Sequence, residues 1–277
     1  MSGQVSESDF ESVRQSARAF EPDRYLAALL SASPVRADLL ALAAFAGEIA
    51  KIPVQVREPI AGEIRIQWWS YALLAGTTGV ASGNPVADAF ADTVRRRSLP
   101  LPLLDEYLAA HAHRLYSVGP LDDEALRLEL DLTEGTLFKL AARIAGVEDS
   151  AAARCIIAEA AQAYGLARLG LNMPYFVVRG RDPLPGCDGA ALAENSARLH
   201  QALAKICGQS RLCFAKVKAQ FSQVSPALKS VLLPVALVEP YLRALEVPQH
   251  DPARDIAAIS PMTRVWRITR AHWTGRI

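Results

Sequence analysis

Residues Leu39 to Val56 read LLALAAFAGEIAKIPVQV, a stretch in which apolar side chains recur at helical spacing. Leu42, Phe45 and Ile49 follow one another at intervals of three and four residues, so they share one side of a helix. Only one acid, Glu48, interrupts the stretch. The pattern predicts a long helix whose apolar stripe packs into a protein core.

Helical spacing continues outward from this stretch in both directions. Strand-like alternation is nearly absent, and the apolar run 176–178 is too short to predict a strand. Pro53 is expected to bend or end the helix that contains it. The sequence predicts an all-α fold with helices at 8–20, 23–32, 35–56, 63–74, 85–97, 101–116, 122–145, 150–171, 191–223, 226–245 and 261–272.

Length and charge limit the kind of protein. A chain of 277 residues can bury roughly 70–75% of its unfolded surface, enough for one large domain. We expect an extension at 1–22, a helical domain at 23–250 and a basic amphipathic tail at 251–277. Lys and Arg number 30 against 29 Asp and Glu, which argues against the broad basic surface of a nucleic-acid binder.

Hydropathy argues against a membrane-spanning protein. Hydrophobic residues make up 51% of the chain and the mean hydropathy is +0.13, but no apolar run approaches the ~20 residues that cross a bilayer. Residues 1–9 lack the basic and apolar regions of a secretory signal. We therefore expect a cytoplasmic protein.

The last segment, 261–277, has a different composition. Its arginines alternate with apolar residues, as in helices that lie on anionic membranes. A terminal helix packed on the core is the alternative interpretation. The segment is the candidate for peripheral contact with the inner face of the membrane, through Arg264, Val265, Trp266, Arg267, Ile268, Arg270, Trp273 and Arg276.

No cysteine or histidine spacing predicts a zinc site. His111 and His113 are two residues apart and would point to different sides of a helix, so a solvated or capping role is expected for both. The run Arg95-Arg96-Arg97 is expected to be a solvated helix end. No Cys-x-x-Cys pair occurs, and reduced thiols are expected at Cys155, Cys187, Cys207 and Cys213.

Three strings are more specific. They are GEIRIQWW at 62–69, EGTL at 134–137, and an RGR turn at 179–181 followed by PLP at 183–185. In this order and spacing they resemble the squalene/phytoene synthase family of head-to-head prenyl synthases. The resemblance covers roughly residues 23–245. It implies an isoprenoid synthase fold, a single large helical bundle around a central cavity.

The resemblance also implies where acids should lie. Active members of the family carry two aspartate pairs that hold magnesium, and Mg²⁺ requires oxygen ligands. The matching positions here are Ala50 and Val54 in the first region and Asn172 and Phe176 in the second. The resemblance therefore implies that this chain has no metal site, no catalytic residue and no cofactor.

One string is similar to a divergent branch of the family. Residues 57–69 read REPIAGEIRIQWW, close to the Ser-Glu-Pro-x-x-Gly-x-x-Arg-x-Gln-Trp-Trp string of the mitochondrial complex I assembly factors and their bacterial relatives. That branch also lacks the aspartates. The likeness implies a non-catalytic helper protein for a membrane respiratory complex, whose partner is a complex subunit or an isoprenoid lipid.

Two alternatives stay open. The chain could be an active prenyl transferase that condenses isoprenoid diphosphates with magnesium, using acids such as Glu48, Glu134 and Asp182. It could also bind an isoprenoid lipid without transforming it.

Seven residues are candidates for ligand or partner contact. The two tryptophans could pack between helices instead, Arg65 and Gln67 could simply be exposed, and the two arginines of the RGR turn could hold either a phosphate or their own loop. The candidates are Arg65, Gln67, Trp68, Trp69, Tyr164, Arg179 and Arg181.

Overall fold

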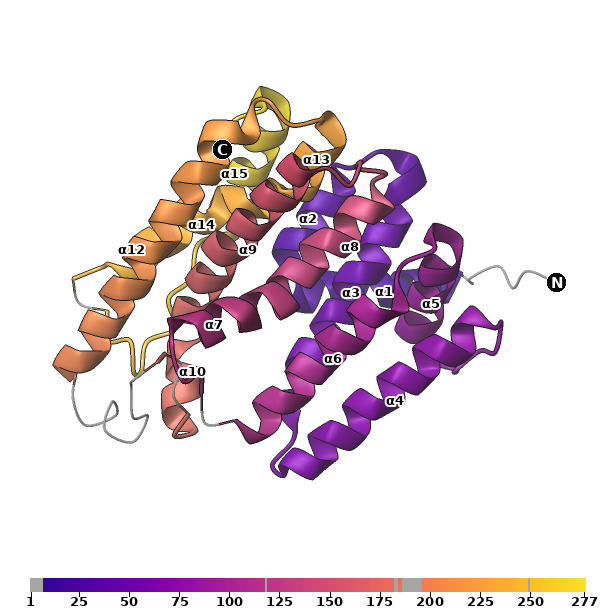
Figure 1. Cartoon of the computed structure of the whole chain (residues 1–277), viewed down its shortest axis with the longest axis horizontal. Coiled ribbons are helices and arrows are strands. Elements are labelled where there is room, and N and C mark those ends of the chain that lie inside the picture. The colour runs from indigo at the N-terminus through magenta and orange to yellow at the C-terminus, as the bar shows by residue number, and fades with distance from the viewer. Residues whose placement is uncertain (1–6, 118, 182–183, 186–195, 249) are drawn as a thin grey trace. The chain divides into compact units, whose positions relative to one another are not determined.

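The computed structural model describes residues 7–117, 119–181, 184–185, 196–248 and 250–277. Within these residues every regular element is a helix, so the all-α prediction is confirmed (Figure 1). The described residues divide into two compact units. Unit 1 comprises Met1–Tyr116 and Lys139–Glu148, and unit 2 comprises Ser117–Phe138 and Asp149–Ile277.

In unit 1, three helices begin at proline, which has no backbone N–H to lose in a first turn. Its core is aromatic: the Phe45 ring stacks on Phe90 with 4.4 Å between centroids and meets the edge of Trp69 at 5.5 Å. The helices are α1 (Glu7–Phe20), α2 (Pro22–Leu29), α3 (Ser33–Gln55), α4 (Pro59–Thr77), α5 (Pro85–Arg97) and α6 (Leu101–Tyr116).

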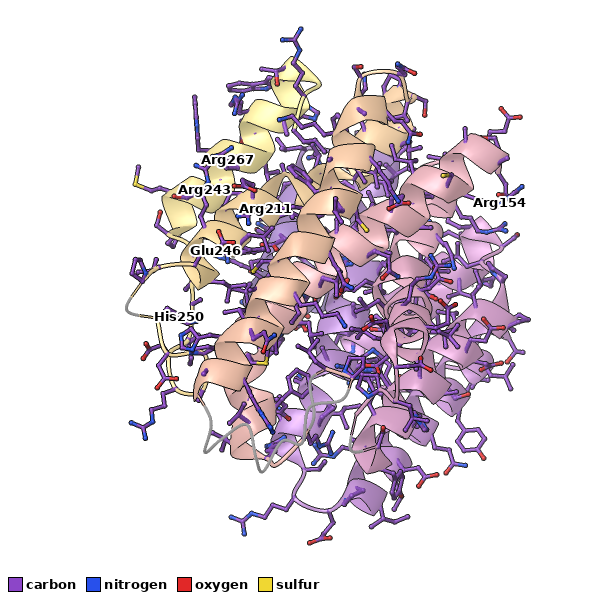
Figure 2. All side chains as sticks on the ribbon, turned by 60° about the vertical axis from the view of Figure 1, so that its left-hand side comes forward. Arg154, Arg211, Arg243, Glu246, His250 and Arg267 are labelled. Atoms are coloured by element: carbon purple, nitrogen blue, oxygen red, sulfur yellow. The ribbon has the colours of Figure 1, made fainter. Side chains whose placement is uncertain are left out.

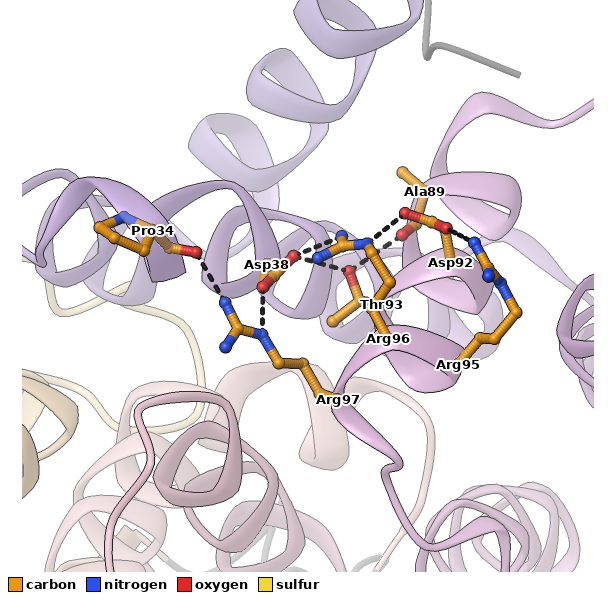
Figure 3. Close-up of polar contacts among 8 residues, drawn as sticks. All are labelled: Pro34, Asp38, Ala89, Asp92, Thr93, Arg95, Arg96 and Arg97. Carbon is orange, nitrogen blue, oxygen red and sulfur yellow. Dashed lines mark hydrogen bonds and ion pairs between the residues drawn. The ribbon is translucent and has the colours of Figure 1, made fainter. Parts of the chain in front are cut away.

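A buried acid joins α3 to the end of α5. Asp38 is 1% exposed, and its two carboxylate oxygens accept hydrogen bonds from Arg96 and Arg97, each at 2.6 Å (Figure 3). The Thr93 hydroxyl donates to the same carboxylate at 3.3 Å. The run lies at a helix end with Arg95 and Arg96 exposed, as expected, but two of its three arginines also bind an acid that lies 58 and 59 residues away in sequence, which was not predicted.

Unit 2 is organised around α9, which lies beside α12 (Figure 1). Small residues allow close packing: a Cβ at Gly170 would lie 2.6 Å from the end of the Leu245 side chain, so a larger residue there would displace that side chain. The elements are α7 (Asp123–Leu130), the π-helix η1 (Asp131–Gly135), α8 (Thr136–Ile144), α9 (Ala151–Leu171), α10 (Met173–Val178), α12 (Ser196–Phe221), α13 (Pro226–Val231), the 3₁₀-helix η2 (Leu233–Leu237), α14 (Val238–Leu245) and α15 (Pro261–Thr274). α8 contributes residues to both units.

Several expectations need correction. The helix predicted at 122–145 is interrupted by η1, and the one predicted at 226–245 is interrupted by η2. His111 is buried, with its ring 4.6 Å from that of Tyr107, because the two residues are one turn apart on the inner side of α6. His113 is exposed, as expected. The boundaries at 22 and 250 and the central cavity stay predictions.

Among the described helices, none combines the length and the apolar character needed to cross a membrane.

Candidate functional site

The first aspartate-equivalent region lies at the end of α3 in unit 1. Ala50 and Val54 are both exposed there, and their methyl and isopropyl groups have no oxygen to offer a cation. The nearby acid, Glu48, already has partners: it forms an ion pair with Lys51 at 2.6 Å and accepts a hydrogen bond from the Ser16 hydroxyl at 2.8 Å. Its negative charge is therefore neutralised within unit 1.

The second aspartate-equivalent region lies where α9 passes into α10 in unit 2. Asn172 ends α9, and its side-chain amide donates to the Arg168 carbonyl at 2.9 Å. Phe176 lies on α10 with its ring edge-on to Tyr175 at 5.8 Å. One position thus caps a helix and the other packs an aromatic ring, and neither offers a carboxylate.

A charged cluster lies one helical turn earlier on α9. Arg168 forms an ion pair with Glu134 of η1 at 3.2 Å, and its guanidinium lies 5.5 Å from the centre of the Tyr164 ring. The buried Tyr164 in turn meets the edge of Phe138 at 5.9 Å. Tyr164 and Glu134 are among the residues considered from the sequence, but Arg168, the cation that joins them, is not. The available signal was an arginine in an alanine-rich helix, four residues after Tyr164.

The π-helix η1 gives this cluster its shape. π-Helices often occur at functional sites, because the extra residue in the turn displaces neighbouring side chains. A Cβ at Gly165 would lie 2.9 Å from Leu130 and 3.3 Å from Glu134, so the glycine allows η1 to approach α9. At the end of η1, the fully buried Thr136 hydroxyl has no hydrogen-bond partner among the described residues.

The residues at the positions matched to the family's aspartates do not supply the carboxylate oxygens that bind Mg²⁺. In the part of the chain that the structure describes, no three His, Cys, Asp or Glu side chains gather closely enough to hold a metal ion. Glu48 and Glu134, the acids considered for the alternative, are each paired with a cation. Asp182 lies outside the described residues.

The turn after α10 is held by Arg179. Its guanidinium donates to the Tyr175 hydroxyl and lies 4.2 Å from the centre of that ring. Gly180 has a φ of 62°, in the left-handed region that glycine adopts without strain, and the Arg181 N–H donates to the Phe176 carbonyl at 3.0 Å. The contacts of Arg179 favour the loop-fixing interpretation. Phosphate binding by Arg179 or Arg181 stays a prediction.

The two tryptophans of α4 have different environments. Trp69 is 5% exposed and packs on Phe45, whereas Trp68 is 40% exposed. Arg65 and Gln67 are also exposed, and they bond to Gln55 at 3.2 Å and to Tyr71 at 3.4 Å respectively. Further apolar side chains are exposed along the same side of the helix. We call this set the α4 stripe: Ile60, Ile64, Trp68, Tyr71 and Leu74.

Comparison with solved structures identifies the fold. The squalene synthase HpnC from Alicyclobacillus acidocaldarius matches with a TM-score of 0.70 and 17% identity over 86% of this chain and 93% of its own. A dehydrosqualene synthase solved in complex with a ligand matches with a TM-score of 0.76 and 13% identity over 97% and 96%. These likenesses confirm the isoprenoid synthase fold.

A search of curated proteins gave no match. The family profile named Squalene/phytoene synthase matches residues 17–275, a longer stretch than the resemblance suggested. The chain therefore belongs to the squalene/phytoene synthase family.

Proposed function

We propose that this chain is a non-catalytic member of its family that acts as an assembly or helper protein for a membrane respiratory complex. The observation that carries the proposal is the chemistry at the four aspartate-equivalent positions. They hold a methyl, an isopropyl, an amide and a phenyl group at Ala50, Val54, Asn172 and Phe176. The ion pairs of Glu48 and Glu134 add support, because each would have to break before its carboxylate could bind a metal.

The size of the catalytic deficit supports the same proposal. Loss of a diphosphate from an allylic carbon requires positive charge where the leaving group develops negative charge. Removing one preorganised stabilising donor from an active site typically costs about 2.7–4 kcal/mol, a factor of about 10²–10³ in rate. Absence of four metal ligands would leave no measurable turnover.

The α4 stripe is the surface that we assign to the partner. α4 has 19 residues, which gives a length of roughly 28 Å at 1.5 Å per residue. The stripe residues recur at intervals of three and four along it, so they form one continuous apolar line. Such a line matches an apolar helix of a partner subunit laid along it. Exposed Glu63 and Arg65 flank the stripe and could fix the register.

Affinity capture of the tagged full chain from its native host tests the proposal. We expect subunits of a respiratory complex to co-purify with the wild type and to be lost with the double variant Trp68→Ala/Tyr71→Ala. Leu212→Ala is the control, since Leu212 is an exposed apolar residue of a helix in unit 2. If no such subunits co-purify, or if both variants lose them equally, the proposal fails.

The same purified protein distinguishes the isoprenoid-binding alternative. Extraction of the captured protein with organic solvent, followed by mass spectrometry, detects a bound isoprenoid. A bound isoprenoid without co-purifying subunits would favour a carrier over a helper. We expect subunits to be retained whether or not lipid is removed.

A further inference from the structure

The C-terminal helix α15 is a complete, well-anchored helix. The Ser260 hydroxyl accepts a hydrogen bond from the Thr263 N–H at its start, and Gly275 ends it in the left-handed conformation with a φ of 63°. Ile268 and Ala271 are buried on its inner side, and the helix packs on η2 within unit 2. The other side chains of α15 are therefore exposed on a formed helix and not on a frayed chain end.

The outer side of α15 is apolar and aromatic. Trp266 is 62% exposed and Trp273 is 76% exposed, and Met262 and Val265 are exposed as well. Met262, Trp266 and Trp273 are separated by four and seven residues, so they lie in one line along the helix. Exposed apolar residues that gather in this way mark an interaction surface.

The segment that contains this line carries charge of a single sign. No acid occurs between residues 256 and 277, whereas the segment contains Arg264, Arg267, Arg270 and Arg276. Arg270 and Arg276 are exposed, and Arg267 is half-buried. Figure 2 shows α15 as the pale yellow helix at the outer edge of unit 2, with Arg267 on it and Arg154 of α9 at the far side of the view.

We propose that α15 docks unit 2 onto the surface of an anionic lipid membrane. The charge complementarity commits the surface to this occupant: the segment 256–277 is basic and contains no acid, which matches lipid phosphates, and its arginines sit beside tryptophans. Trp is favoured at a membrane interface because its ring is largely apolar but carries an N–H donor. A basic helix with an aromatic face lies in the interface plane and binds through both contributions. The inference is independent of the proposed helper function.

Co-sedimentation of the full chain with lipid vesicles tests the proposal. We expect the wild type to bind vesicles of phosphatidylcholine mixed with phosphatidylglycerol at least about tenfold more tightly than vesicles of phosphatidylcholine alone, and to lose this preference at high salt. Trp266→Ala/Trp273→Ala and Arg267→Gln/Arg270→Gln are each expected to weaken binding to the anionic vesicles about tenfold or more.

Two matched variants control for composition. Phe10→Ala/Tyr116→Ala removes two exposed aromatic residues from unit 1 and is expected to bind like the wild type. Arg127→Gln/Arg154→Gln removes two exposed arginines elsewhere in unit 2 and lowers the net charge by the same amount. Equal loss of binding in these controls would overturn the proposal. Failure of the wild type to bind anionic vesicles, with or without self-association through α15, would overturn it too.

Discussion

At the scale of single residues, the Asp38 carboxylate is a buried acid of unit 1 held between two arginines. Asp38→Asn would remove the charged partner that Arg97 has in this contact and leave Arg96 paired with Asp92 alone, beside a buried amide. Hydrogen bonds to charged groups contribute about 1.5–3 kcal/mol each, and the arginines are partly hydrated. We expect the variant to lower the free energy of unfolding by about 2–3 kcal/mol, measured by urea denaturation.

The control for Asp38 is Asp149→Asn. Asp149 pairs with Arg154 at 2.8 Å, but both side chains are exposed, and exposed pairs contribute about 0–1 kcal/mol. Equal losses of unfolding free energy in the two variants would contradict the claim that burial strengthens the contacts of Asp38.

The surroundings of two cysteine thiols predict that the free energy of unfolding depends on pH in the alkaline range. Burial raises the pKa of Cys207 and of Cys213 from an ordinary 9.0 to about 11. The folded state therefore holds these protons more tightly, so their contribution to stability is complete below pH 9 and is lost as the pH rises through about 11.

Among the three cysteines that the structure describes, alkylation with iodoacetamide near neutral pH should modify exposed Cys155 first and buried Cys207 last, because reaction requires an accessible thiolate. Peptide mass spectrometry gives the order. Modification of Cys207 as fast as Cys155 in the folded protein would contradict the burial argument.

At the scale of helices, two adjacent residues of α4 have different environments: Trp69 lies in the core and Trp68 lies at the surface. Trp69→Ala removes a buried ring from the aromatic core and should cost about 3–5 kcal/mol of unfolding free energy. Trp68→Ala should cost less than about 1 kcal/mol, since Trp68 is exposed and contributes mainly its edge contact with Trp69 at 5.2 Å. Thermal or urea denaturation of both variants measures the difference, and similar losses would disprove this division.

Local sequence signals located helices well where capping residues mark their ends. α5 spans Pro85–Arg97 as predicted, because the Asn84 side chain accepts hydrogen bonds from two backbone N–H groups at its start. The π-helix η1 was not predicted, because helical periodicity in the sequence continues on both sides of it. The Arg168–Glu134 pair escaped for another reason: the partners lie on different elements, and spacing along one helix does not reveal such contacts.

At the scale of the whole molecule, family membership and the proposed absence of metal ligands lead to a thermodynamic expectation. A ligand that binds only the native state raises the Tm. We expect Mg²⁺ to leave the Tm of this protein unchanged relative to sodium chloride of equal ionic strength, as measured by scanning calorimetry. A rise specific to Mg²⁺ would reveal a native metal site.

The most direct test is release of pyrophosphate from farnesyl or geranylgeranyl diphosphate, incubated with the purified full chain, Mg²⁺ and a reductant. Because the four aspartate-equivalent positions offer no carboxylate, we predict no release above the protein-free control. Mg²⁺-dependent release that disappears on chelation would contradict the assignment of this chain as a non-catalytic member of its family.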